Sequence, residues 1–173
     1  MAGCVWETPN ATAVATYWKN GKPVNLTDGL QTAVAHAIVI SGNDVYLAGS
    51  EGGNAVFWKN GNSETLAYGG GFFVPAEATA MAISGPDVYI AGAVPGAFPG
   101  TNTGHKVAVY WKNGVQVNLT PDSVLSVATD IAVSGSDVYV VGRERDTAVY
   151  WKNGDTVHLT HEINEEKNYP LTC

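Results

Sequence analysis

The sequence predicts an all-β fold, a four-bladed β-propeller of four-stranded antiparallel blades, from two recurring words and the absence of helical patterning. The word YWKNG or FWKNG occurs four times in 173 residues, at 17–21, 57–61, 110–114 and 150–154. The word Ser-Gly-x-Asp-Val-Tyr occurs three times, at 41–46, 84–89 and 134–139. No segment shows sustained helical periodicity. Recurrence near 40 residues is typical of propeller blades.

The unit at 127–159 contains all four expected strands of a blade. VATDIAV (127–133) is the first strand, and after a Ser-Gly turn DVYVVG (137–142) is the second. TAVYWK (147–152) and DTVHLT (155–160) are the third and fourth, joined by Asn-Gly. Asn-Gly is the strongest two-residue hairpin signal, because a type I′ turn needs positive φ at both central residues. The same pattern gives units of about 31–67, 78–120 and 127–160 in one domain, 1–173.

The chain ends predict a fourth blade that is split between the termini, 161–173 plus 1–27. Without gaps, aligning Trp18 on Trp151 places Cys4 on Asp137. Counting from Trp151 through the C-terminus and on to Trp18 gives 40 residues, which equals two of the other three tryptophan gaps. The last strand would then pair with the first and close the ring, which removes exposed sheet edges. Alternatively, the chain is half of an eight-bladed propeller formed by a head-to-tail dimer.

The two cysteines fit the closed ring. Cys4 and Cys173 would lie across the ends of the closing hairpin, where a Cα separation of about 5.5 Å suits a disulfide. A disulfide implies an oxidising compartment, so we expect a secreted, extracellular or cell-surface protein. Met-Ala-Gly-Cys at 1–4 also resembles the end of a bacterial lipoprotein signal, whose cysteine is lipidated. Both uses of Cys4 stay open.

Composition and charge exclude several classes of partner. The chain is 45% hydrophobic and 14% charged, which is too apolar for a disordered chain. Its net charge of -7 argues against nucleic acid and anionic membrane as partners. The apolar runs are a handful of residues long, so no membrane span is expected.

The repeated residues are expected to be structural. The four tryptophans at equivalent strand positions should pack between successive blades rather than stack on sugars. Asp44, Asp87 and Asp137 each follow the Ser-Gly turn, and we expect them to bond turn amides rather than a metal.

The pattern A-x-A-I-x-x-SG-x-DVY-x-AG, followed by AVYWKNG and a leucine, resembles the extracellular HAF-type repeat and related bacterial β-propeller repeats. The resemblance covers most of the chain. It implies a propeller in a surface or secreted protein, and it lends no catalytic residue. This chain departs from the pattern by carrying Lys-Asn at the hairpin.

The expected strand order separates two kinds of connection. The Ser-Gly and Asn-Gly turns share one end of the blades, and the loops that differ between blades share the other. Variable loops on a rigid scaffold are where binding residues concentrate. The candidate ligand-binding residues at that end are Tyr68, Phe72, Phe73, Phe98, His105, Arg143 and Arg145. Exposed aromatic side chains beside polar groups suit a glycan or a protein ligand.

We therefore expect a secreted, non-enzymatic binding module, either a monomer or a head-to-tail homodimer. One alternative is a structural or assembly unit of a surface or extracellular complex. Another is a hydrolase that uses channel-mouth carboxylates, Asp130 and Asp122. Glycosidases need a carboxylate pair, and the positions equivalent to Asp130 are Ala37, Ala80 and Pro170. The histidines lack metal-ligand spacing, so no cofactor is expected beyond a structural ion that the channel could hold.

Overall fold

The structure is a computed structural model that describes residues 1–5, 12–69, 74–97 and 104–159. These ranges contain fifteen β-strands and no helix, which confirms the all-β prediction. A helix able to cross a membrane is accordingly not found in them.

The strands form four antiparallel sheets, here called blades 1 to 4, and within each sheet neighbours in sequence pair with each other. Blade 1 has three strands, β1 (Ala2–Val5), β2 (Val14–Lys19) and β3 (Lys22–Asn25). Blade 2 has β4 (Ala33–Ser41), β5 (Asp44–Glu51), β6 (Asn54–Lys59) and β7 (Asn62–Ala67). Blade 3 has β8 (Glu77–Ser84), β9 (Asp87–Ala97), β10 (Gly104–Lys112) and β11 (Val115–Asn118). Blade 4 has β12 (Ser126–Ser134), β13 (Asp137–Glu144), β14 (Thr147–Lys152) and β15 (Asp155–His158).

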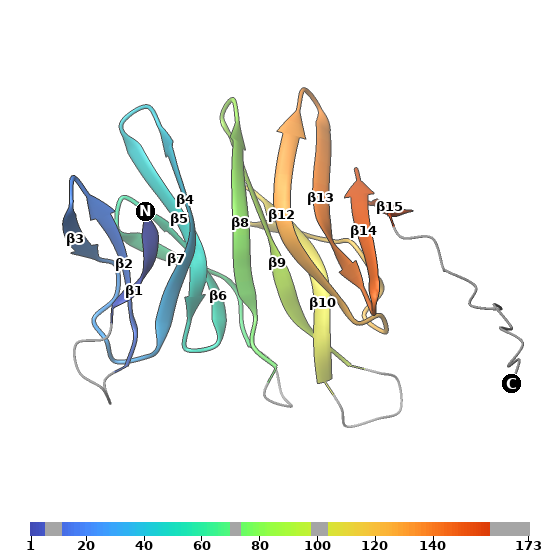
Figure 1. Cartoon of the computed structure of the whole chain (residues 1–173), viewed down its shortest axis with the longest axis horizontal. Coiled ribbons are helices and arrows are strands. Elements are labelled where there is room, and N and C mark those ends of the chain that lie inside the picture. The colour runs from blue at the N-terminus through green and yellow to red at the C-terminus, as the bar shows by residue number, and fades with distance from the viewer. Residues whose placement is uncertain (6–11, 70–73, 98–103, 160–173) are drawn as a thin grey trace, which may run out of the picture.

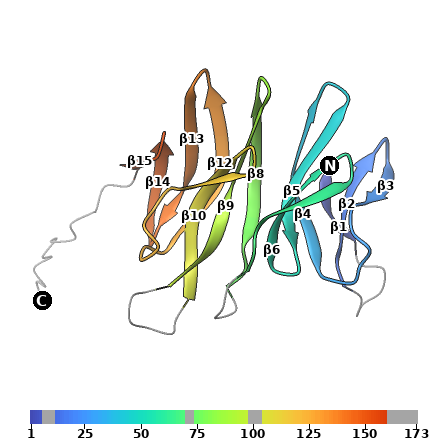
Figure 2. The ribbon, with the colours of Figure 1, turned by 180° about the vertical axis from the view of Figure 1, so that it is seen from behind.

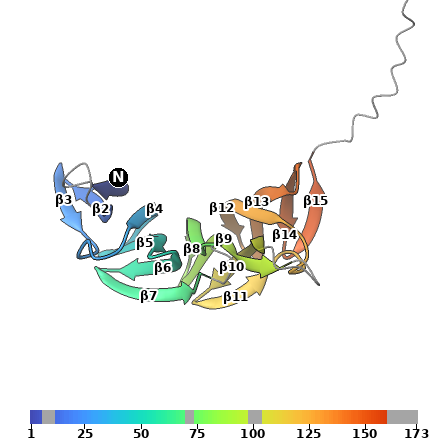
Figure 3. The same ribbon diagram turned by 90° about the horizontal axis from the view of Figure 1, so that it is seen from below.

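The blades stand side by side in chain order (Figures 1 and 2), and they follow an open crescent (Figure 3). Seen from below, the first strands β4, β8 and β12 lie on its inner side and the last strands β7, β11 and β15 on its outer side (Figure 3). Blades 1 and 4 lie at opposite ends of the crescent (Figures 1 and 3). The arrangement is that of propeller blades, and closure into a ring stays a prediction.

The four Asn-Gly turns have the backbone that their sequence predicts. Asn20, Asn60, Asn113 and Asn153 have φ between 51° and 53°, and each following glycine has φ between 79° and 95°. Positive φ at both central residues defines the type I′ turn, which matches the twist of the flanking strands. Asparagine and glycine tolerate this left-handed region better than other residues.

Each full blade has two apolar faces, named here by their aromatic residue. The tryptophan face carries Trp58 in blade 2, Trp111 in blade 3 or Trp151 in blade 4, and the tyrosine face on the other side carries Tyr46, Tyr89 or Tyr139. Blade 1 has the same two faces, marked by Trp18 and Tyr17. The tryptophan face of each later blade packs on the tyrosine face of the blade before it. The prediction that these tryptophans pack between blades is confirmed for the three that are fully buried.

The pairing of β1 differs from the gap-free alignment of the sequence. Ala2 pairs with Tyr17 and Gly3 with Thr16, just as Val141 pairs with Tyr150 and Gly142 with Val149. Gly3 therefore corresponds to Gly142, and Cys4 corresponds to Arg143 rather than to Asp137. The physical reason is steric, since the rings of Trp18, Trp111 and Trp151 each lie over a glycine, and a Cβ on Gly3 would be 3.7 Å from Trp18. The connection from β1 to β2 is correspondingly longer than in the other blades.

This register changes the prediction for the disulfide. Cys4 lies at the end of its strand away from the Ser-Gly turn position, so a bridge to Cys173 would not span the closing hairpin that the alignment suggested. Cys4 is half-buried and in thiol form, and Cys173 lies outside the described residues. A disulfide between Cys4 and Cys173 therefore stays a prediction, and the expected position of Cys4 in a closing hairpin no longer supports it.

Candidate functional site

The two ends of the blades are built differently, as the strand order predicts. One end, here the turn end, carries the Ser-Gly turns after β4, β8 and β12 and the four Asn-Gly turns. It lies at the top of Figure 1. The other end, here the loop end, carries the connections between the second and third strands and those between blades. These connections differ in length and sequence from blade to blade.

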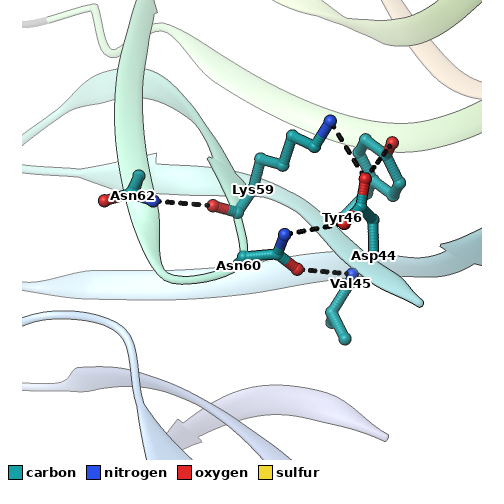
Figure 4. Close-up of polar contacts among 6 residues, drawn as sticks. All are labelled: Asp44, Val45, Tyr46, Lys59, Asn60 and Asn62. Carbon is teal, nitrogen blue, oxygen red and sulfur yellow. Dashed lines mark hydrogen bonds and ion pairs between the residues drawn. The ribbon is translucent and has the colours of Figure 1, made fainter.

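A network of four side chains holds the turn end of blade 2 (Figure 4). Lys59 Nζ lies 3.1 Å from Asp44 Oδ2 and 5.1 Å from the centre of the Tyr46 ring. Asn60 Nδ2 donates to Asp44 Oδ1 at 2.8 Å, and Asn60 Oδ1 accepts from the Val45 amide at 2.9 Å. We call this Asp-Tyr-Lys-Asn network the clasp, because it ties the hairpin of β6 and β7 to the start of β5.

The clasp recurs in blades 3 and 4 with nearly the same geometry. Lys112 Nζ lies 3.0 Å from Asp87, and Lys152 Nζ lies 2.8 Å from Asp137. Asn113 and Asn153 each accept from the amide that follows the aspartate, at 2.9 Å. The aspartates therefore bond the asparagine and lysine of the next hairpin rather than the amides of their own turn, which corrects the sequence prediction.

Hydrogen bonds inside the clasp shift the ionisation of its charged groups. The bond from Asn60 and then that from Lys59 lower the pKa of Asp44, and the equivalent bonds lower the pKa of Asp87 in the same order. The pKa of Asp137 is lowered first by the bond from Lys152 and then by that from Asn153. Hydrogen bonds with Tyr89 and Asp87 raise the pKa of Lys112 to about 12. The clasp is therefore fully charged across the physiological range. It fixes a uniform surface, and it offers no group poised for proton transfer.

The loop end carries the candidate ligand-binding residues, and the structure describes four of the seven. Tyr68 is 77% exposed, and next to it the Gly69 amide donates to Asn54 Oδ1 at 2.9 Å. That bond ties the end of the segment after β7 to the start of β6. Phe72, Phe73 and Phe98 lie outside the described residues.

His105 lies in a different environment from the loop that its sequence suggested. β9 and β10 are each three residues longer than β5 and β6, so that His105 belongs to β10 and pairs with Gly96 of β9. Only 6% of its surface is exposed, and a Cβ on Gly96 would lie 3.2 Å from its Nε2. His105 therefore packs inside blade 3 and supports the loop end from within.

The two candidate arginines lie together at the end of β13. Arg143 Nη1 donates to the Arg145 carbonyl at 3.2 Å, and Arg145 has a φ of 49°. Both are exposed. Arg143 points from the tyrosine face of blade 4, at the position that Ala93 occupies in blade 3. Its place on that face was not anticipated from the sequence.

The inner strands carry three titratable residues, His36, Glu77 and Asp130. Glu77 pairs with Lys106 Nζ at 2.6 Å, both side chains being about one quarter exposed. Burial lowers the pKa of His36, while the nearby Glu77 acts in the opposite direction. Asp130 is exposed and accepts from the Ile131 amide at 2.8 Å. Within the described ranges, no three His, Cys, Asp or Glu side chains gather closely enough to hold a metal.

Sequence reasoning did not anticipate an apolar groove between blades 1 and 2 at the turn end. Its volume is about 470 Å³. The residues that line it are Met1, Tyr17, Trp18, Lys19, Asn20, Ile38, Ile40 and Val45. In blade 3, Met81 occupies the position of Ile38, and Ala37 and Val39 of β4, the first strand of blade 2, cover it. The described residues of blade 1 include no such first strand to cover Ile38, so the groove opens there.

Comparison with known proteins found no matching family model and no matching curated protein. The resemblance to HAF-type repeats stays a prediction.

Proposed function

We propose that the chain is a secreted, non-catalytic binding module that presents its loop end to a glycan or a protein. One observation carries the proposal, namely the contrast between the two ends of the blades. Three equivalent clasps keep the turn end uniform. Length and side-chain chemistry vary at the loop end, where a rigid sheet below each loop holds its position.

The blades are proposed to belong to a closed propeller. The inner position of β4, β8 and β12 and the repeated packing of tryptophan face on tyrosine face support this architecture. Closure within one chain would give four blades, with the C-terminal segment completing blade 1. Closure across two chains would give eight, and the open crescent favours that form.

Binding is tested with a glycan array and with pull-down from extracellular fluid, followed by variants of the loop end. We expect Tyr68→Ala and the pair Phe72→Ala with Phe73→Ala to weaken binding at least tenfold, because aromatic side chains supply much of the contact energy in such sites. The matched control is Val115→Ala, which removes an equally exposed apolar side chain from the turn end. Binding that survives the loop-end variants but is lost in the control would place the site at the turn end and overturn the proposal.

A second candidate function is that of an assembly unit. The observation that favours it is the exposure of apolar side chains on the outward faces of blades 1 and 4, among them Met1, Val141 and Leu159. Large apolar surface of this kind marks sites of protein association.

A further inference from the structure

One kind of contact between blades is made three times within the chain. In the contact between blades 3 and 4, Trp151 and Val140 of the tryptophan face pack with Tyr89 and Ala91 of the tyrosine face. Equivalent residues make the other two contacts. Each chain therefore has two faces of this kind left over, the tyrosine face of blade 4 and the tryptophan face of blade 1. They lie at opposite ends of the crescent (Figure 3).

The tyrosine face of blade 4 keeps the apolar character of an internal contact but is uncovered. Val141 is 40% exposed, whereas its counterpart Ala91 in blade 3 is completely buried. Leu159, whose amide bonds the Ala148 carbonyl, is 59% exposed. Its counterpart Leu119, whose amide bonds the Ala108 carbonyl, is 6% exposed. Val141 and Leu159 therefore occupy positions that the tryptophan face of a following blade covers in blade 3.

The tryptophan face of blade 1 is open at its turn end. Met1 is 84% exposed, whereas Leu47, its counterpart in blade 2, is completely buried. Trp18 is partly exposed, unlike the three other repeated tryptophans. Val14 and Thr16, further toward the loop end, are already buried. The uncovered part of the face therefore centres on Met1 and Trp18.

We propose that the tyrosine face of blade 4 docks onto the tryptophan face of blade 1 of a second copy of this chain. The docked pair repeats the internal contact, with Trp18 and Met1 in the places of Trp151 and Val140, and Tyr139 and Val141 in those of Tyr89 and Ala91. The three internal contacts identify the occupant, because the chain itself supplies both halves of the interface. This inference does not depend on the ligand proposed for the loop end.

A second copy satisfies both faces without altering the molecule. For the two faces of one chain to meet, the ends of the open crescent would have to approach each other, which changes the angles between neighbouring blades. Two copies instead keep the three internal contacts and add two more of the same kind. Head-to-tail contacts close into a ring when the rotation allows it and otherwise extend into a filament. Two crescents joined at both ends form the ring of eight blades.

Two charged residues distinguish the end face from the internal ones. Asp130 and Arg143 stand on the tyrosine face of blade 4 at the positions of Ala80 and Ala93 in blade 3. Ala93 is completely buried. Charges at these positions keep the unpaired face soluble, and their desolvation opposes docking. Association between copies is therefore weaker than packing between blades of one chain, and it is reversible.

The test is the mass of the full chain in solution, measured by light scattering and native mass spectrometry across a wide range of concentrations. A reductant is present, so that cysteines cannot link copies. We expect twice the chain mass at high concentration. Val141→Glu places a charge in the centre of the docked face and should leave monomer, with circular dichroism unchanged. Val115→Glu, the same substitution at an exposed valine of β11, is the control and should leave the dimer intact.

Two further samples separate this arrangement from others. Replacing both charges, with Asp130→Ala and Arg143→Ala, should make the end face resemble an internal one and tighten the dimer at least tenfold. Val141→Glu mixed with Trp18→Gln should form a mixed dimer through the one intact interface, provided that each variant is folded by circular dichroism. Wild-type monomer at every concentration would overturn the proposal. A dimer that persists in Val141→Glu, or that fails to form in the mixture, would show that copies meet through other faces.

Discussion

At the scale of single residues, four letters of the repeated word YWKNG have a structural task. The tryptophan packs on the preceding blade, and the asparagine and glycine form the type I′ turn. The lysine pairs with the aspartate at the start of the second strand, and the asparagine bonds both that aspartate and the next amide. The two repeated words therefore recur together because their side chains bond each other.

Replacing the asparagine of one clasp should destabilise the fold more than replacing the same residue where the clasp is incomplete. In Asn153→Ala, alanine takes up a left-handed backbone and the Val138 amide loses its side-chain acceptor. We expect the free energy of unfolding to fall by about 2 kcal/mol, measured by urea denaturation.

The matched control for this change is Asn20→Ala in blade 1. Asn20 has the same φ, but the described residues of blade 1 include no counterpart of Asp137 or Val138. The expected loss is about 1 kcal/mol, from the backbone alone. Equal losses in the two variants would mean that the clasp bonds add nothing to stability.

At the scale of strands and blades, most of the architecture could be predicted from the sequence. Type I′ turns have a narrow chemical signature, and alternation of apolar and polar residues fixes the face of each strand. Because the chain contains three full repeats, the strands predicted in one unit could be compared with those predicted in the other two. These local rules explain why the hairpins, the strand order and the separation of turn end from loop end agree with the sequence predictions.

The predictions that differ from the structure concern the lengths of the connections between strands. Nothing in the sequence marks where a longer connection begins, so the gap-free alignment placed Cys4 on Asp137, whereas pairing with β2 places it on Arg143. Likewise, the extra residues near His105 continue β9 and β10 instead of forming a loop. In both places pairing with the neighbouring strand decides the register, and that pairing is a long-range property.

The glycine of the second strand provides a test at the scale of a blade. A Cβ on Gly142 would lie 2.1 Å from the Val127 carbonyl oxygen and 3.0 Å from the Trp151 ring. Gly142→Ala should therefore force β12 and β13 apart and lower the free energy of unfolding by about 3 kcal/mol. The measurement is thermal or urea unfolding followed by circular dichroism.

Gly3→Ala is the control, since Gly3 occupies the same position in a blade without a described first strand. Its nearest neighbour would be the Trp18 ring at 3.7 Å, an ordinary contact. We expect a change within about 0.5 kcal/mol. A large loss in Gly3→Ala would indicate a further strand against β1.

At the scale of the whole molecule, the candidate site was less predictable than the fold. The sequence was enough to place the candidate residues at one end of the blades, because that placement depends only on the order of the strands. It did not reveal that His105 is buried or that Arg143 stands on an end face, because both depend on packing between strands. The apolar groove was also missed, since it arises from what surrounds Ile38 and Ile40 rather than from any motif.

The leucine after the fourth strand distinguishes internal from terminal faces of the crescent. Leu119→Ala, in the contact between blades 3 and 4, should lower the free energy of unfolding by about 3 kcal/mol. Leu159→Ala, at the uncovered end, should cost about 0.5 kcal/mol in dilute solution. Denaturation at several protein concentrations provides the measurement. If copies join through this face, the cost of Leu159→Ala should grow as concentration rises.

The repeated contact between blades has a consequence for how such a molecule can change in size. Tryptophan face on tyrosine face uses equivalent residues at each junction, so the junction does not specify which unit comes next. A unit duplicated or deleted whole would find compatible neighbours on both sides. The circumference of the assembly is then set by the number of units that are available, and not by any one of them. Growth by duplication needs no new interface, only a new loop.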